Sequence, residues 1–241
     1  MFHLKLYPRK TALFFLSIVV LLTVLHGITQ AMFLSTLNED LLELTEYFDL
    51  DIEKNIPSLY SAFAILCSSL LFFCIASLEK KQQERRRYWL GLAAVFLFLS
   101  LDEAFALHEG LGDYTEELIK STGILEATGL LYFPWIIPYS MLTSILGLLY
   151  FRFIFGLPRR IMLLMILSAI IFLTGAVGFD MVGGKEAELH GYYSNRYIVL
   201  YTIEEFLEMI GIVLLIYTLL AYIEQQHGHL RLSLTIQKAK P

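Results

Sequence analysis

The chain has 241 residues, of which 57% are hydrophobic and 17% are charged, and its formal net charge is −5. A soluble domain carries about 45–50% apolar and about 25% charged residues. The apolar residues are also grouped in stretches long enough to cross a lipid bilayer. The composition therefore excludes a soluble enzyme, a nucleic-acid-binding protein and a disordered scaffold, and it predicts that the chain resides in a lipid bilayer.

Six apolar stretches can each cross a hydrocarbon core of about 30 Å as a helix that rises 1.5 Å per residue. They lack the alternating pattern of barrel strands, and a helix satisfies its own backbone polar groups in lipid. We therefore predict an all-α, polytopic membrane protein, a bundle of six transmembrane helices that forms one transmembrane domain over residues 1–241. The predicted spans are Thr11–Leu34, Pro57–Leu78, Tyr88–Glu109, Phe133–Leu157, Ile161–Met181 and Tyr197–Ile223.

Basic residues are distributed unequally between the connections of these spans. Of the 18 lysines and arginines, all but Lys54, Lys120, Lys185 and Arg196 lie in the two terminal segments and in the second and fourth connections. Short cytoplasmic loops are enriched in lysine and arginine. We therefore expect a multi-pass protein of the bacterial inner (cytoplasmic) membrane with both termini in the cytoplasm. A membrane-protein partner or a homo-oligomer is compatible with this topology.

The first outer connection, Ser35–Ile56, is acidic but contains leucines and aromatic residues at the spacing of an amphipathic helix on the membrane surface. A second short surface helix is expected around Thr115–Leu118. The segment Asp49–Glu53 faintly resembles a calcium loop, but it lacks the glycine and the distal glutamate of such a loop. We therefore interpret it as a solvated acidic face.

Carboxylates occur where a membrane span would not be expected to carry them. A charged residue at the bilayer centre costs about 2.5–3.5 kcal/mol on the most lenient scale. No lysine or arginine lies deep in a predicted span to neutralise them, so they must be protonated, hydrated or bound to a cation. The acids within or at the edge of the spans are Asp102, Glu103, Glu109, Asp180, Glu204, Glu205 and Glu208.

The depths of these groups predict that they converge. At 1.5 Å per residue, Asp102 lies about 21 Å above the cytoplasmic start of the third span, and Asp180 about 28 Å above that of the fifth. Glu208 lies about 16 Å below the outer start of the sixth span, and His26 about 22 Å above the start of the first. Four helices therefore carry acidic or imidazole groups in the outer half of the bilayer.

Carboxylate and imidazole ligands suit iron, zinc or manganese, and helix bundles can hold such ions between facing helices. We predict a metal site that opens outward, in a protein that acts as a metal-dependent hydrolase or oxidoreductase. The Glu-x-x-His pair of di-metal carboxylate bundles is absent. The first-choice ligands are Asp102, Glu103, His108, Glu109, Glu204 and Glu208, and the second choices are Glu205, His190, His26 and Asp180.

Two other functions remain open. Intramembrane acids and histidines also mark proton or cation pathways, so a coupled transporter or channel is an alternative. The acids can also belong to a non-catalytic subunit or assembly factor in which they bind one another. His26 suits a hydrogen-bonded core histidine as well as a ligand, and His190 is expected in an exposed loop.

Two short motifs carry a family resemblance. Leu101-Asp102-Glu103 is followed after four residues by His108-Glu109, and Glu204-Glu205 is followed after two by Glu208-Met209. This combination resembles a family of uncharacterised bacterial multi-pass membrane proteins over the third to sixth spans. The resemblance implies a shared site but no assigned activity.

Overall fold

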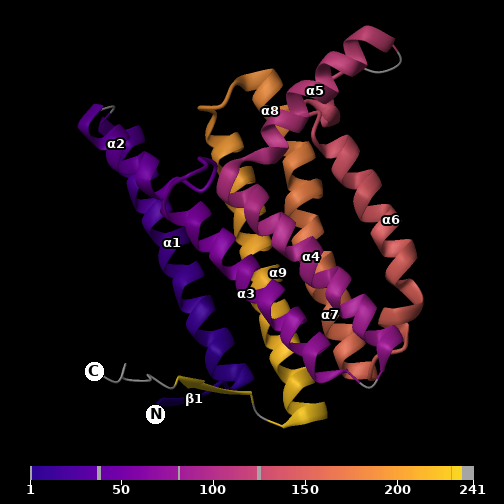
Figure 1. Cartoon of the computed structure of the whole chain (residues 1–241). Helices are drawn as coiled ribbons and strands as arrows, with labels where there is room; N and C mark the ends of the chain where they lie inside the picture. Colours follow the sequence, from indigo (N-terminus) through magenta and orange to yellow (C-terminus); the bar gives the residue numbers. More distant parts are fainter. Residues whose placement is uncertain (1, 37–38, 81, 124–125, 229, 235–241) are drawn as a thin grey trace, which may run out of the picture.

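The computed structural model describes residues 2–36, 39–80, 82–123, 126–228 and 230–234. Six of its helical segments are long and apolar enough to cross a membrane (Figure 1). The elements in chain order are β1 (Phe2–Lys5), α1 (Pro8–Thr36), α2 (Glu39–Phe48), α3 (Ile56–Leu78), α4 (Gln83–Phe105), α5 (Leu107–Thr122), η1 (Gly129–Leu131), α6 (Ile136–Phe155), α7 (Arg159–Leu173), η2 (Thr174–Phe179), α8 (Asp180–His190), α9 (Asn195–His227) and β2 (Arg231–Leu234).

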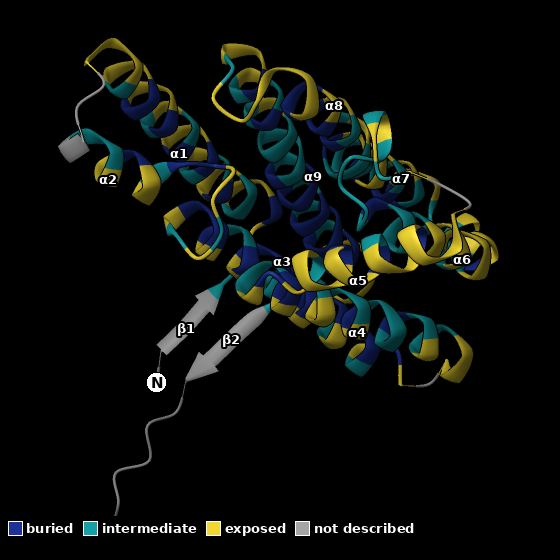
Figure 2. Cartoon of the chain, turned by 90° about the horizontal axis from the view of Figure 1, so that it is seen from above, coloured by how far each residue is buried: buried dark blue, intermediate teal, exposed yellow. Residues whose placement is uncertain are grey.

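Helix α9 is the central element of the bundle. Seen from above, it is drawn in the dark blue and teal of buried and partly buried residues, and α1, α3 and α7 pack against it (Figure 2). Helix α6 lies at the periphery and makes few contacts, chiefly with α4, α5 and α7. The helix that carries three of the predicted glutamates is therefore the helix that most other spans pack against.

The six predicted spans are confirmed as six long apolar helical segments, but two boundaries were wrong. The third span was predicted to run to Glu109, whereas α4 ends at Phe105 and a separate helix, α5, begins at Leu107. The fifth was predicted to end at Met181, whereas α7, η2 and α8 form one continuous segment from Arg159 to His190. Both differences fall next to predicted site residues.

The surface helices expected in the outer connections are present as α2 and α5. One feature was not predicted: β1 and β2 pair as an antiparallel two-stranded sheet in which Phe2 lies opposite Leu234 and Lys5 opposite Arg231. Strand pairing brings the first and last described segments together at one end of the bundle (Figure 1). The remainder of the described chain is helical or turn, which confirms the all-α class for the bundle.

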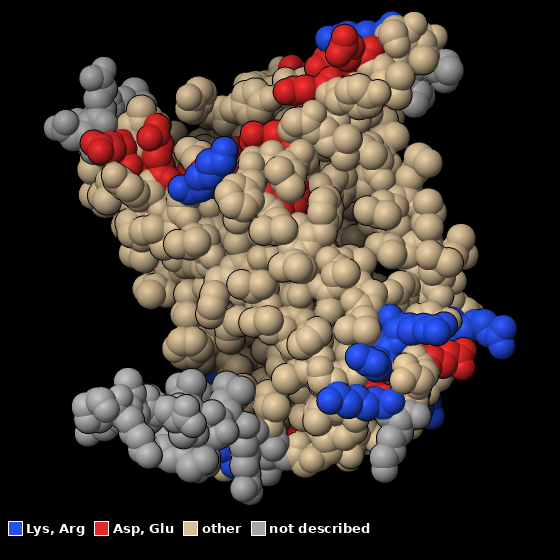
Figure 3. Space-filling model, viewed as in Figure 1, with Lys and Arg blue, Asp and Glu red and all other residues tan. Residues whose placement is uncertain are grey.

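Charged side chains divide the bundle into two ends, as Figure 3 shows. We call the end with the terminal strands and the α3–α4 and α6–α7 connections the basic end, and the opposite end, with α2, α5 and α8, the acidic end. Arginines of the two connections gather at the basic end, and most carboxylates gather at the acidic end (Figure 3). Lys81, Lys238 and Lys240, which contributed to the topology prediction, lie outside the described residues.

The core of the basic end is aromatic and closely packed. Trp89 is completely buried, and its ring centroid lies 5.9 Å from that of Phe72, 4.9 Å from that of Phe153 and 5.1 Å from that of Tyr222. These four residues come from α3, α4, α6 and α9. The cluster therefore joins four spans below the level of the predicted site.

Candidate functional site

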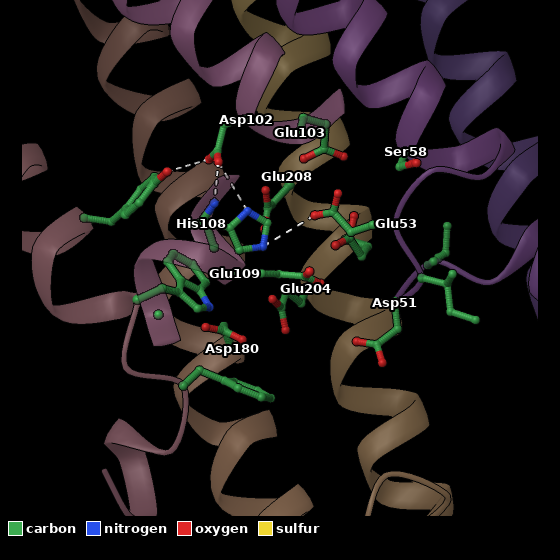
Figure 4. A pocket seen from close by; sticks show the side chains of 18 of the residues that line it. Asp51, Glu53, Ser58, Asp102, Glu103, His108, Glu109, Asp180, Glu204 and Glu208 are labelled. Atoms are coloured by element: carbon green, nitrogen blue, oxygen red, sulfur yellow. Dashed lines mark hydrogen bonds and ion pairs between the residues drawn. The ribbon is translucent and has the colours of Figure 1, made fainter. Parts of the chain in front are cut away.

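The acidic end contains a cavity of about 550 Å³ between α3, α4, α5, α8 and α9, which we call the acidic cavity (Figure 4). Eight of the ten predicted ligands line it, and no lysine or arginine among the described residues does so. Its only imidazole is that of His108. The carboxylates in its lining are Asp51, Glu53, Asp102, Glu103, Glu109, Asp113, Glu116, Asp180, Glu204, Glu205 and Glu208.

Helix α9 supplies the most compact group of carboxylates. Glu204 and Glu208 lie one helical turn apart, and Glu205 flanks them on the same face. One oxygen from each of these three residues lies within 4.8 Å of the others. All three residues are half-buried. The triad therefore offers three oxygen ligands to a single ion, without contributions from other helices.

A break between helices α4 and α5 positions Asp102 and His108. Ala106 adopts a left-handed conformation (φ 55°, ψ 46°), which costs an alanine roughly 1–2 kcal/mol. The backbone N–H of His108 donates to Asp102 Oδ1 at 2.7 Å, and the Tyr139 hydroxyl donates to Asp102 Oδ2 at 2.8 Å. The buried Asp102 thus accepts one hydrogen bond from α5, just after the break, and one from α6.

The break changes where His108 points. If the third span continued as one helix, His108 would lie beside Asp102 on that helix. In the structure, the His108 ring points into the cavity and packs against Trp135, with ring centroids 5.3 Å apart. Its Nδ1 lies 3.5 Å from Asp102 Oδ1 and its Nε2 lies 3.4 Å from Glu53 Oε1 (Figure 4). Burial alone would lower the pKa of His108, but Asp102, Glu53 and Glu103 outweigh it and raise that pKa.

Asp180 reaches the cavity through an irregular stretch of helix. The segment η2 is π-helical, and such turns are frequent at functional sites. It packs closely on α9 because residue 175 is glycine: a Cβ there would lie 2.6 Å from the carbonyl oxygen of Glu204. Asp180 follows directly, is only 6% exposed, and its Oδ2 is buried without a hydrogen-bond partner.

The connection between α2 and α3 also contributes to the cavity, which the sequence analysis missed. Gln30 Nε2 donates to Asp49 Oδ2 at 2.7 Å, and the Tyr197 hydroxyl donates to Asp51 Oδ1 at 3.0 Å. Asn55 caps α3 by accepting from the N–H of Ser58. The interpretation of this segment as a solvated acidic face fits Asp51, which is exposed, but was wrong for Asp49, which is buried, and for Glu53, which is half-buried in the cavity lining.

Glu53 is the carboxylate of this connection that faces His108. Burial raises its pKa to about 7; His108 opposes this shift, whereas Glu109 and Asp102 increase it. Its Oε2 is buried and has no hydrogen-bond partner. The alternation of acidic and apolar residues from Asp49 to Glu53 was the sequence signal that could have placed Glu53 at the site. Leu50, one of these apolar residues, is buried and anchors the segment against the core. Asp113 and Glu116, on α5, carry no comparable signal.

Two predicted histidines lie outside the cavity lining. His26 is buried; its Nε2 lies 3.0 Å from Thr202 Oγ1, and its Nδ1 accepts from the N–H of Leu50 at 3.4 Å. It therefore acts as a hydrogen-bonded core residue that helps to hold the α2–α3 connection. His190 is exposed, as expected, but it lies on α8 instead of in a loop, and its Nδ1 is 3.0 Å from Glu186 Oε1.

A family model described as a domain of unknown function (DUF8692) matches residues 12–223. The match includes most or all of each span and every carboxylate that lines the cavity. No curated protein and no solved structure matches the chain.

Proposed function

Since the chain belongs to the DUF8692 family, whose function is unknown, we propose a function from the geometry of its site: the protein binds a divalent metal ion in the acidic cavity. The Glu204, Glu205 and Glu208 triad is the centre of this proposed site. We further propose that the bound metal serves an enzymatic reaction, a hydrolysis or a redox conversion, at the level of the membrane surface.

The observation that carries the proposal is the charge of the cavity lining. Eleven carboxylates and one histidine surround the space, without a lysine or arginine from the described residues. The eight of them that are buried or half-buried cannot all stay ionised in a region of low dielectric unless a cation offsets them. An oxygen-rich donor set with a single imidazole favours manganese or iron over zinc.

Asp102 supports this function indirectly in our proposal. Metal-binding histidines usually donate their second ring N–H to a carboxylate, which fixes the tautomer and the ring orientation. Asp102 lies 3.5 Å from His108 Nδ1 and already accepts hydrogen bonds from the backbone of His108 and from Tyr139. We therefore assign Asp102 as a positioning residue for His108 and remove it from the first choice of direct ligands.

The chemistry follows from the donor set. A metal ion at the triad would polarise a bound water or substrate. Glu109 is exposed where it lines the cavity, and a carboxylate left free of the metal can serve as a general base. The aromatic residues Trp135 and Tyr192 border the same space and can exclude water from part of it.

The test is the metal content of the purified protein. We expect wild-type protein that is reconstituted with Mn²⁺ and desalted to retain stoichiometric metal by elemental analysis. The Glu204→Gln/Glu208→Gln variant should retain at least one equivalent less. Glu79→Gln is the control, because Glu79 is a buried glutamate at the basic end, away from the cavity, and it should retain the wild-type content. Wild-type protein without stoichiometric metal would overturn the proposal.

Transport is less well supported by the geometry. The deepest residues of the cavity lining include Ile65, Leu99 and Phe172, and the aromatic cluster around Trp89 packs beneath them. A cation pathway would need a polar route through that cluster. Cation flux into proteoliposomes that is abolished by Glu208→Gln would favour transport over our proposal.

We also propose that the basic end faces the cytoplasm of a bacterial inner membrane, because lysine and arginine concentrate in cytoplasmic loops. The acidic cavity would then open to the outer side. A reporter that is active only in the cytoplasm should be active when it is fused after Pro241, and a reporter that is active only in the periplasm should not. Activity of a periplasmic reporter at this position would reverse the orientation.

A further inference from the structure

The basic end carries a groove that the proposed metal site does not use. The groove is open, has a volume of about 530 Å³ and lies between α7 and α9, where it is lined by Arg159, Arg160, Leu163, Leu164 and Tyr217. We propose that it binds one anionic phospholipid, whose phosphate contacts the two arginines and whose acyl chain follows the leucines. The inference is independent of the metal site, which lies at the opposite end of the bundle.

The polar part of the groove lies where a span leaves the bilayer. Helix α7 begins the fifth membrane-crossing segment at Arg159. The Ser168 hydroxyl donates to the carbonyl oxygen of Gly211 at 2.7 Å, which sets α7 level with α9. From that contact, at 1.5 Å per residue, Arg160 lies about 12 Å and Tyr217 about 9 Å toward the basic end. The two side chains therefore meet at the level of the interface, where a phospholipid carries its phosphate.

The positive charge of the groove is not offset by carboxylates of the described chain. Arg160 Nη2 donates to the Tyr217 hydroxyl at 2.8 Å, a neutral partner, and the groove lining contains no acid among the described residues. The described lysine and arginine that form ion pairs, Lys120 and Arg196, both lie at the acidic end. A guanidinium binds phosphate oxygens through paired N–H donors. Arg159 and Arg160 therefore favour a phosphate as the partner of the groove.

The apolar part of the groove continues toward the middle of the bilayer. Leu163 lies one helical turn beyond Arg159 on the same face of α7, and Leu167 and Ile170 continue that face. The side chains of Leu163, Leu167 and Ile170 are all exposed on the surface of the bundle. An acyl chain that begins at the phosphate therefore has a continuous apolar strip to follow. A phospholipid combines the phosphate and the chain in this order.

The charge of the groove also selects among phospholipids. A zwitterionic headgroup such as phosphocholine places a cation beside the phosphate, and two guanidinium groups repel that cation. An anionic headgroup such as phosphoglycerol carries no cation, and basic pockets between membrane helices bind anionic headgroups. A soluble phosphate would gain nothing from the leucines. The occupant is therefore an anionic phospholipid of the leaflet at the basic end.

Native mass spectrometry of the delipidated, full-length protein tests the inference, in titrations with phosphatidylglycerol and with phosphatidylcholine of the same chain length. We expect wild type to bind one phosphatidylglycerol about tenfold more tightly than phosphatidylcholine. Arg159→Gln/Arg160→Gln should lose this preference, and Tyr217→Phe should weaken it by about two- to fivefold. The matched control, Lys80→Gln/Arg87→Gln, removes two charges from exposed residues at the same end and should keep the preference.

Three outcomes would overturn the inference. Equal affinity of wild type for the two lipids would mean ordinary solvation of an apolar surface. An equal loss of preference in Lys80→Gln/Arg87→Gln would mean that the net charge of the basic end, and not the groove, attracts the lipid. Displacement of phosphatidylglycerol by excess glycerol 3-phosphate would mean a site for soluble phosphate. If the double arginine variant does not fold, the preference of wild type and its change in Tyr217→Phe decide the question.

Discussion

The two ends of the bundle bury carboxylates in opposite ways. At the basic end, Glu79 is 6% exposed, accepts a hydrogen bond from the Tyr222 hydroxyl and lies 3.8 Å from His227 Nε2. At the acidic end, eleven carboxylates share one cavity and one histidine. A single buried acid can thus be compensated by neighbouring side chains, whereas the acidic cavity contains many more carboxylates than its one histidine can offset. We therefore interpret the first as structural and propose the second as a binding site.

The largest effect should come from the core of the basic end. Trp89→Ala removes a completely buried indole that packs against three aromatic rings, and we expect it to cost about 3–5 kcal/mol of unfolding free energy. Reversible unfolding in mixed micelles measures this loss. Metal content per folded molecule should not change. Trp135→Ala, at the half-buried tryptophan of the cavity, should cost less, and the reverse order would contradict the assignment of the two ends.

Removing the partner of Glu79 should have the next largest effect. Tyr222→Phe leaves the buried carboxylate without its hydroxyl donor, so we expect a loss of about 1–3 kcal/mol. The control is Tyr217→Phe, whose hydroxyl accepts a bond from Arg160 on the surface and whose loss should cost less than 1 kcal/mol. Equal losses in the same unfolding assay would show that Glu79 does not depend on Tyr222.

Removing a carboxylate from the acidic cavity should raise the free energy of unfolding instead of lowering it. Glu205 faces Glu208, Glu103 and Glu204, so Glu205→Gln should stabilise the metal-free protein by about 1 kcal/mol through loss of like-charge repulsion. Glu186→Gln is the contrast, because Glu186 is buried but paired with His190 and Arg196. Glu186→Gln should therefore destabilise the metal-free protein. Unfolding of chelator-treated protein in the same assay measures both effects. Destabilisation by Glu205→Gln would contradict the proposed like-charge repulsion in the cavity.

The last expected effect is a dependence on pH. Burial raises the pKa of folded Glu53 to about 7, so its stabilising contribution is complete below about 4.5 and is lost as pH rises through 7. The raised pKa of His108 acts in the same direction. Between pH 5 and 8 the metal-free protein should lose stability, with a Tm change of about 2–4 °C for each kcal/mol.

Mn²⁺ should reverse this slope, because metal ligands must lose their protons to bind. Differential scanning fluorimetry at matched ionic strength measures both curves. Glu53→Gln should flatten the metal-free curve, whereas Glu79→Gln should leave it unchanged. A metal-free protein that becomes more stable between pH 5 and 8 would refute the assignment of the raised pKa values.

The spans and most of the cavity lining were predictable because they depend on local sequence. Apolar stretches predict spans from length alone, and Asp102, Asp180 and Glu204 lie at similar depths once those spans are drawn. The depth of a residue along its predicted span could not distinguish His26 from the residues that line the cavity. That histidine lies on a different side of α9, and only the packing of the helices shows this.

The break at Ala106 and the contribution of Glu53 could not be predicted, for related reasons. Alanine is the strongest helix former, so nothing local predicts a left-handed alanine at position 106. The hydrogen bonds that compensate its cost involve Asp102, His108 and Tyr139, and the last of these lies on another helix. Glu53 likewise enters the cavity through contacts of its connection with α1 and α9.

The π-helical segment η2 has a consequence for how the site can be altered by insertion or deletion. Its bonds join residues five apart instead of four, so it holds the equivalent of one inserted residue. Each residue turns a helix by about 100°. Deleting one residue between 174 and 179 should therefore restore a regular helix with Asp180 still directed at Glu204, whereas inserting one residue into the regular helix α7 should rotate Asp180 away by about 100°. The site should thus be more sensitive to an insertion before this segment than to a deletion within it, which a scan of single substitutions would not reveal.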